Sequence, residues 1–241
     1  GGGSDGAVKL WELKGGTLLK TFAGHSGYVL SVAFNPTGEI LASASGDSTV
    51  KLWEVKTGEL LKTLKGHMYG IPAVAFSPDG KILASGGSDN TIKLWQTGTW
   101  NLLSTLEGHK FGVNSLCFRP DGKILASGSA DNTIKLWDIS NGTLVKTLEG
   151  HNNFVNSISF DPAFGGTGKI LASASNDKTV KIWQVSSGKV LQSLGPNICY
   201  FYSVAFSPDG NYLATGSCSA KDITMECTLG DVRVYQLSWQ K

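Results

Sequence analysis

The sequence predicts an all-β fold built from repeated four-stranded antiparallel units. Three observations lead to this expectation: a repeat period of 42 residues, four strand-length runs in each period, and tight polar turns between the runs. Such a period with four strands per unit is typical of the blades of a β-propeller. The period is marked by His25, His67, His109 and His151, and by Trp11, Trp53, Trp95 and Trp137. Trp183 follows 46 residues after Trp137, because residues 163–166 lengthen one turn.

The third repeat illustrates the four runs. Each has the length of a strand, and none shows the 3.6-residue period of a helix. The turn after the first run contains Pro120, which presets φ, and Gly122, which accepts a positive φ. The first run of every repeat carries small residues, as we expect of strands crowded around a central axis. The runs of the third repeat are 113–118, 124–127, 133–137 and 144–148.

We expect one propeller domain over residues 1–241, with partial blades at both ends. The count is two strands before the first full blade, sixteen in four full blades and three after them, which is not a multiple of four. We favour the interpretation that the chain is a fragment of a six- or seven-bladed ring. Two alternatives remain open: a five-bladed ring with one displaced strand, and a ring that closes by association with another copy. The expected parts are a partial blade 1–25, blades 26–67, 68–109, 110–151 and 152–197, and an atypical terminal blade 198–241.

Composition excludes several classes of partner. Charged residues make up 17% of the chain and the net charge is +2, without the basic excess of a protein that binds nucleic acid or anionic membranes. No apolar run approaches the roughly 20 residues that span a bilayer. The four cysteines, Cys117, Cys199, Cys218 and Cys227, are too few for a disulfide framework. We therefore expect a soluble protein of the reducing cytoplasm.

Four sequence motifs recur in the repeats and resemble those of the WD-repeat family. They are Gly-His, Val-Ala-Phe-Ser-Pro-Asp-Gly, Leu-Ala-Ser-Gly and Asp-x-Thr-hydrophobic-Lys-hydrophobic-Trp. The resemblance covers nearly the whole chain. The near-identical blades are similar to those of bacterial, especially cyanobacterial, WD-repeat proteins, in which such rings often follow a kinase, NTPase or peptidase domain.

The resemblance implies a hydrogen-bonded set of His, Ser, Asp and Trp in each full blade. A His, a Ser and an Asp in contact also fit a hydrolase, because acyl transfer requires a nucleophile beside an oriented base. An active site needs one such set, however, and four copies favour a structural role for buried polar groups. The implied sets are His25, Ser43, Asp47 and Trp53; His67, Ser85, Asp89 and Trp95; His109, Ser127, Asp131 and Trp137; and His151, Ser173, Asp177 and Trp183.

No metal or cofactor is expected. Cys218 and Cys227 match none of the usual zinc spacings and have no histidine nearby.

Family members usually bind partners on the face that carries the loops before the first strand of each blade. Nearly every such loop has an aromatic residue here, whereas the rest of the repeat is almost invariant. Exposed aromatics dominate the energetics of interfaces, so we predict a docking surface. Its predicted residues are Tyr28, Leu30, Tyr69, Pro72, Phe111, Asn114, Phe154, Asn156, Tyr200 and Tyr202.

The last repeat departs from the pattern. Gly195-Pro196 replaces Gly-His, Thr215 replaces the serine and Tyr235 replaces the tryptophan. About ten extra residues around 219–228 predict a long loop on the aromatic face. Long loops on rigid scaffolds often carry function, although terminal repeats are also atypical for capping reasons.

These observations together predict a non-catalytic scaffold that binds other proteins or peptides on its loop face. Self-association through open blade edges is a further expectation. The alternative is a ligand-sensing or regulatory propeller attached to a signalling enzyme, a kinase or NTPase, outside these 241 residues.

Overall fold

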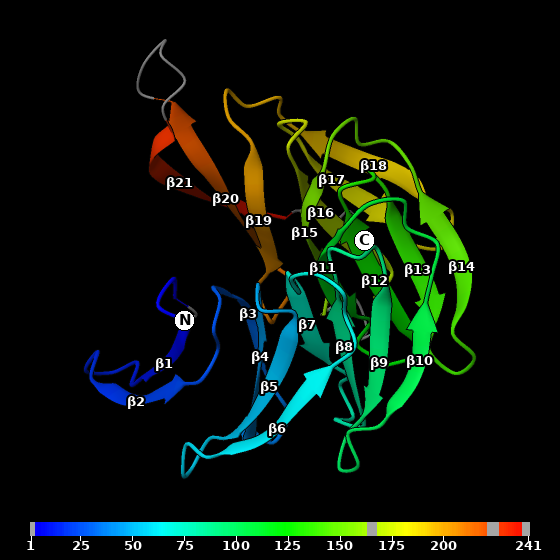
Figure 1. Ribbon diagram of the computed structural model, residues 1–241. Coiled ribbons are helices and arrows are strands. Elements are labelled where there is room, and N and C mark those ends of the chain that lie inside the picture. The colour runs from blue at the N-terminus through cyan, green and yellow to red at the C-terminus, as the bar shows by residue number, and fades with distance from the viewer. Residues whose placement is uncertain (1–2, 163–167, 221–226, 238–241) are drawn as a thin grey trace. The chain divides into compact units, whose positions relative to one another are not determined.

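The all-β prediction is confirmed by the computed structural model of the chain (Figure 1). The structure describes residues 3–162, 168–220 and 227–237, and within these ranges it has 21 strands and no helix. It follows that no described helix could span a membrane. The chain divides into two compact units, Gly1–Leu116 and Cys117–Lys241.

The first unit holds one two-stranded sheet and two four-stranded antiparallel sheets. Within each sheet the strands follow one another in chain order. The two-stranded sheet is β1 (Ala7–Trp11) and β2 (Leu18–Ala23). The next sheet is β3 (Val29–Phe34), β4 (Ile40–Ser45), β5 (Thr49–Glu54) and β6 (Leu60–Lys65). The third is β7 (Ala73–Phe76), β8 (Ile82–Gly86), β9 (Ile92–Gln96) and β10 (Leu102–Leu106).

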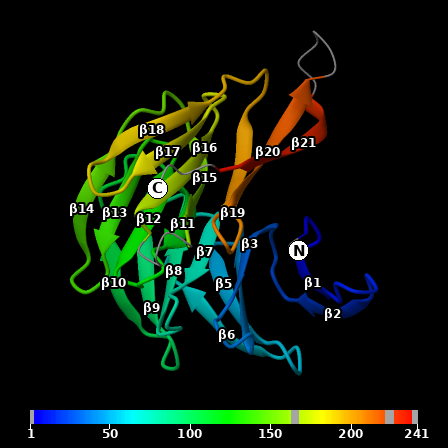
Figure 2. The ribbon, with the colours of Figure 1, turned by 180° about the vertical axis from the view of Figure 1, so that it is seen from behind.

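The second unit continues the series with two more four-stranded sheets and a three-stranded one, seen from behind in Figure 2. The unit boundary falls within β11 (Val113–Phe118), whose sheet goes on with β12 (Ile124–Ser129), β13 (Ile134–Asp138) and β14 (Thr143–Leu148). The next sheet is β15 (Val155–Phe160), β16 (Ile170–Ser175), β17 (Val180–Gln184) and β18 (Lys189–Leu194). The last is β19 (Phe201–Phe206), β20 (Tyr212–Ala220) and β21 (Cys227–Gln236).

The repeated sequence gives every sheet the same register. Ser43 of β4 lies opposite Lys51 of β5, and Leu41 lies opposite Trp53. The second unit repeats this pairing, with Ser173 opposite Lys181. Because side chains alternate across a strand, a conserved register places equivalent residues on equivalent faces of each sheet.

Apolar side chains cover both faces of the sheets, and neighbouring sheets of one unit bury them. Val50 and Leu52 of β5 form one core cluster with Ile71, Val74 and Leu83 of the following sheet. In the second unit, Val180 and Ile182 of β17 pack in the same way against Phe201, Val204 and Leu213. A sheet with two apolar faces needs a neighbour on each side, which explains the stacking.

The small residues of the first strands have a second role that the sequence analysis missed. In the first unit, Ser31 Oγ of β3 accepts a hydrogen bond from the Val74 amide of β7 at 3.3 Å. In the second unit, Ser157 Oγ accepts from the Val204 amide at 3.2 Å. These hydroxyls therefore link the first strands of neighbouring sheets, in addition to allowing their close approach.

The expected long loop at 219–228 is wrong at its two ends, which belong to strands. β20 extends to Ala220 and β21 begins at Cys227, with Cys218 opposite Gly230 and Ser219 opposite Leu229. The described extra residues extend both strands, and Ala220 lies opposite Cys227. Residues 221–226 lie outside the described part of the chain.

Candidate functional site

A buried polar cluster in the first unit joins the loop after β2 to β4, β5 and the turn between them. His25 Nε2 lies 2.8 Å from Ser43 Oγ, and His25 Nδ1 lies 2.8 Å from Asp47 Oδ2. Trp53 Nε1 donates to the same Ser43 Oγ at 2.8 Å. A neutral histidine protonated on Nδ1 satisfies all three contacts: it donates to Asp47 and accepts the serine hydroxyl, whose oxygen accepts the indole N–H.

The cluster recurs with nearly the same geometry in two other sheets. Its four members are in turn His67, Asp89, Ser85 and Trp95, with contacts of 2.9 Å each, and His151, Asp177, Ser173 and Trp183, with contacts of 2.6, 2.7 and 2.7 Å. The third predicted set is divided between the units. His109 is buried in the first unit, and in the second Trp137 Nε1 donates to Ser127 Oγ at 2.8 Å while Asp131 accepts from Thr133.

The aspartate turn contains a threonine that the sequence analysis did not assign to the site. Asp47 Oδ1 accepts from the Thr49 hydroxyl at 2.6 Å and from the Thr49 amide at 2.9 Å. Its Oδ2 also accepts from the Ser26 amide at 3.0 Å. The signal was present in the sequence, because Asp-x-Thr recurs before each of the four third strands from β5 to β17.

These contacts hold the aspartates in the ionised form. Burial alone raises the pKa of Asp47, but the hydrogen bonds from Thr49, His25 and the Ser26 amide outweigh it and bring this pKa to about 2. The pKa values of Asp89 and Asp177 are lowered by the same combination. Burial lowers the pKa of His67, against the attraction of Asp89, and so favours the neutral ring.

The geometry of the cluster does not suit nucleophilic catalysis. A serine nucleophile needs a hydroxyl that can reach a substrate carbonyl. The exposed fraction of Ser43, Ser85 and Ser173 is 0%, and each oxygen already accepts a tryptophan N–H. The cluster can satisfy buried polar groups and fix the turn above it, and it leaves the serine oxygen no approach for a substrate.

The predicted docking residues of the first unit lie in the loops before the first strands and in the first residues of those strands. The aromatic side chains of Tyr28, Tyr69 and Phe111 are between 60% and 63% exposed, and Leu30 is also exposed. Pro72 and Asn114 are half-buried and are therefore less accessible to a partner than the aromatic side chains. We call Tyr28, Leu30, Tyr69 and Phe111 the first aromatic surface.

Backbone hydrogen bonds tie these loops together. The Gly46 amide donates to Tyr28 O, and the Ile71 amide donates to Ser45 O of the same turn. The Ser88 amide likewise donates to Gly70 O, and the Val113 amide donates to Gly87 O. The loop before each sheet is therefore joined to the turn of the preceding one, which holds the exposed aromatics on a fixed backbone.

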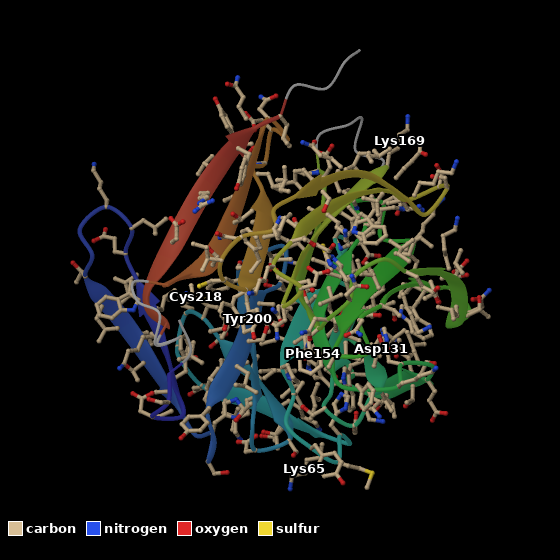
Figure 3. All side chains as sticks on the ribbon, turned by 90° about the horizontal axis from the view of Figure 1, so that it is seen from above. Lys65, Asp131, Phe154, Lys169, Tyr200 and Cys218 are labelled. Atoms are coloured by element: carbon tan, nitrogen blue, oxygen red, sulfur yellow. The ribbon has the colours of Figure 1, made fainter. Side chains whose placement is uncertain are left out.

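The second unit has an equivalent set, which we call the second aromatic surface: Phe154, Tyr200 and Tyr202. All three are exposed, and the rings of Tyr200 and Tyr202 meet edge to face with centroids 6.4 Å apart. Figure 3 shows Phe154 and Tyr200 on neighbouring loops. Asn156 joins these loops, because its Nδ2 donates to Phe201 O at 2.8 Å and to Asn176 Oδ1 at 2.6 Å. Its amide group is thus engaged within the protein.

The described residues contain no group of three or more His, Cys, Asp or Glu side chains arranged to hold a metal ion.

The class of protein follows from the repeated sheets and their buried clusters: a repeat protein whose four-stranded blades stack face to face. The family described as "WD domain, G-beta repeat" (WD40) matches the chain over residues 16–54, 58–96, 100–138, 142–184 and 188–222. These segments cover more than half of the chain, and the protein belongs to the WD40 family. The predicted β-propeller class of four-stranded blades is confirmed by this membership.

One similar protein is the Nuclear distribution protein PAC1 of Tuber melanosporum (strain Mel28). It is 46% identical over 46 residues, which cover 19% of this chain and 10% of that protein. The match has about the length of one repeat, and the chain spans only a small part of that relative. The expected bacterial character of the blades stays a prediction.

Proposed function

We propose that this chain is a non-catalytic scaffold that binds proteins or peptides through the first and second aromatic surfaces. The observation that carries the proposal is the exposure of large rings at or next to the start of the first strand of successive blades. The aromatic side chains of the two surfaces are between 40% and 63% exposed, although the residue that begins each first strand is buried. Exposed aromatics of this kind supply most of the binding energy at protein interfaces.

The fixed backbone beneath the rings supports the same function. Binding is weakened by the entropy lost when flexible loops become ordered. Here the hydrogen bonds from Gly46, Ile71 and Ser88 in the first unit, and from Asn176 in the second, order the loops in advance. A partner would therefore bind to aromatic residues whose backbone is already ordered.

The buried clusters support the non-catalytic part of the proposal. Their serine oxygens are buried, and the same set recurs in three blades. The net charge of +2 favours neither nucleic acid nor an anionic membrane as partner. We accordingly propose protein or peptide partners in the cytoplasm, with no cofactor.

The test is an affinity capture from cell lysate with two matched triple variants. The first, Tyr28→Ala, Phe154→Ala and Tyr200→Ala, removes rings from both aromatic surfaces. The second, Leu61→Ala, Leu103→Ala and Leu191→Ala, removes three side chains of similar exposure from the outermost strands β6, β10 and β18. Circular dichroism and thermal unfolding establish that both variants fold like the parent chain.

The proposal expects proteins that are captured by the parent chain and by the leucine variant but not by the aromatic variant. Mass spectrometry identifies them, and their binding is then measured with purified components. If the aromatic variant retains every protein that the parent captures, the two aromatic surfaces are not the docking site.

A further inference from the structure

One turn of the second unit holds a lysine where the other blades hold a smaller polar residue. In the four complete sheets, the turn between the second and third strands has a residue with positive φ between its aspartate and its threonine. These residues are Ser48 with φ 67°, Asn90 with φ 69°, Asn132 with φ 71° and Lys178 with φ 69°. Asparagine tolerates this left-handed region better than other non-glycine residues do. Lysine therefore occupies a position where asparagine would be less strained.

The lysine also lacks a contact that asparagine makes at this position. Asn90 Nδ2 donates to Lys110 O at 3.2 Å and so joins its turn to the loop before β11. Lys178 is exposed, and its Nζ forms no hydrogen bond or ion pair with another described residue. No contact within the described chain accounts for this charged group. A strained residue that the fold does not require is a candidate for a functional contact.

The turn that carries Lys178 lies between the two loops of the second aromatic surface. On one side, the Asn176 amide donates to Phe154 O at 2.9 Å. On the other side, the Asn197 amide donates to Lys178 O at 2.9 Å. The backbone of the lysine is thus hydrogen-bonded to the loop that leads to the remaining exposed side chains of this surface. These side chains are Ile198, Tyr200 and Tyr202.

The two loops beside the lysine carry no charge of their own. Residues 151–156 and 196–202 include no Lys, Arg, Asp or Glu. Asp177, next to Lys178, is buried and its Oδ2 lies 2.6 Å from His151 Nδ1. Nucleic acids and anionic membranes are bound by several cations, and phosphate groups chiefly by arginine clusters. A single ammonium beside neutral rings therefore fits one carboxylate on an otherwise apolar ligand.

We propose that the second aromatic surface binds an acidic peptide segment. An Asp or Glu carboxylate of the segment pairs with Lys178, and neighbouring apolar side chains pack on Phe154, Tyr200 and Tyr202. This inference rests on the proposed scaffold function and adds the chemistry of the partner. The rings supply most of the affinity. The lysine supplies specificity, because it attracts a carboxylate and repels a basic segment.

The first test selects ligands from a random peptide library displayed on phage. Selections run in parallel on the parent chain and on the Lys178→Asn variant, whose new residue is the one found at positions 90 and 132. We expect peptides from the parent selection to be enriched in Asp or Glu beside apolar residues, and peptides from the variant selection to lose the acidic residue. A parent selection without acidic enrichment, or without any enriched peptide, would overturn the inference.

The second test measures one selected peptide by fluorescence anisotropy. Lys178→Asn, and replacement of the acidic residue of the peptide by its amide, should each weaken binding by about fivefold at low ionic strength, with a smaller effect at high salt. If the two groups pair, the double change weakens binding by about the same fivefold, whereas independent effects multiply to about twenty-five-fold. Multiplication would refute the pairing. Lys189→Gln, which removes an equal charge at the start of β18, should leave binding unchanged.

The backbone strain predicts a second effect of Lys178→Asn. Asparagine suits a φ of 69° better and provides an amide for a contact like that of Asn90. We therefore expect the melting temperature of the variant to rise by about 1–3 °C although its peptide binding is weaker. Circular dichroism during heating measures it. A lower melting temperature would show that the fold itself requires Lys178 and would contradict the inference.

The triple variant Tyr28→Ala, Phe154→Ala and Tyr200→Ala distinguishes failure of this inference from failure of the scaffold proposal. The inference expects the selected peptides to lose affinity for this variant and for Lys178→Asn. Peptides weakened by the triple variant alone would support aromatic docking and refute the acidic partner. Peptides that bind the triple variant as tightly as the parent chain would refute both proposals.

Discussion

Each serine of the buried clusters forms hydrogen bonds with two other buried side chains, a histidine and a tryptophan. Ser85 Oγ lies 2.9 Å from both His67 Nε2 and Trp95 Nε1. Leaving a buried donor or acceptor without a partner costs about 1–3 kcal/mol. We expect Ser85→Ala to lower the free energy of unfolding by about 2–4 kcal/mol, because it leaves both of these nitrogens unpaired. Urea unfolding followed by tryptophan fluorescence measures this.

Thr215 provides the matched control for Ser85. It occupies the same position in the last sheet, but its Oγ1 is buried without a hydrogen-bond partner among the described residues. Thr215→Val replaces an unsatisfied hydroxyl with a methyl group of similar size and should be neutral or stabilising. Equal destabilisation by Ser85→Ala and Thr215→Val would mean that the hydrogen bonds of the cluster do not account for its stability.

The lowered aspartate pKa values predict acid sensitivity. The pKa of Asp47 is about 2 in the folded protein, against an ordinary value of 3.8. A depressed folded pKa contributes stability above the unfolded value, and this contribution is lost as the pH falls from about 4 to about 2. The pKa of the buried, neutral His67 is also lowered, so the protein loses further stability as the pH falls below the ordinary histidine pKa of 6.5.

Thermal unfolding at a series of pH values tests this expectation. Asp47→Asn cannot ionise, so the variant should be less stable than the parent at pH 7 and lose less further stability between pH 4 and pH 2. If the stability of the variant and of the parent falls equally between pH 4 and pH 2, the role assigned to Asp47 is contradicted.

The family resemblance implied the four sets, and the structure places the members of three of them, those of His25, His67 and His151, in hydrogen-bond contact. The sequence did not assign Thr49 or Ser31 a contact. The recurring Asp-x-Thr motif carried the signal for Thr49, whereas the Ser31 hydroxyl gains its partner only through the close approach of a neighbouring sheet. The engagement of Asn156 with Phe201 O is also invisible in sequence, because it joins residues 45 positions apart.

At the scale of elements, the last sheet differs from its neighbours in several ways that all reduce local stability. It has no histidine cluster, Thr215 is unsatisfied, and Val232 and Val234 are exposed. Amide exchange reports such local differences, because opening free energies follow buried contacts. We expect amides of β19–β21 to exchange at least about tenfold faster than those of β15–β18. Equal protection would show that the missing cluster does not weaken the sheet.

Strand bounds were predictable where the repeat is regular and less so where it is not. The run at 113–118 coincides with β11, because the turn residues on both sides are strong signals. The extra residues near 219 contain no proline and do not break the alternation of the strand. Nothing local therefore indicated that β20 and β21 would extend into this segment, as the pairing of Ser219 with Leu229 shows that they do.

At the scale of the whole molecule, the chain carries an exposed apolar sheet face and very little net charge. Its net charge of +2 provides weak repulsion between copies, and low net charge promotes association. The exposed valines of β21 add an edge that can pair with another copy. We therefore expect the purified chain to self-associate in a concentration-dependent way.

Two double variants separate the effect of charge from that of the face. Val232→Lys with Val234→Lys, and Val190→Lys with Leu191→Lys, each add two positive charges at exposed apolar positions, the first pair on β21 and the second on β18 of the same unit. Sedimentation velocity at several concentrations should show weaker association for the β21 variant than for the β18 variant. An equal decrease in both would assign association to the low net charge alone, because only the β21 variant alters the exposed valines of the last sheet.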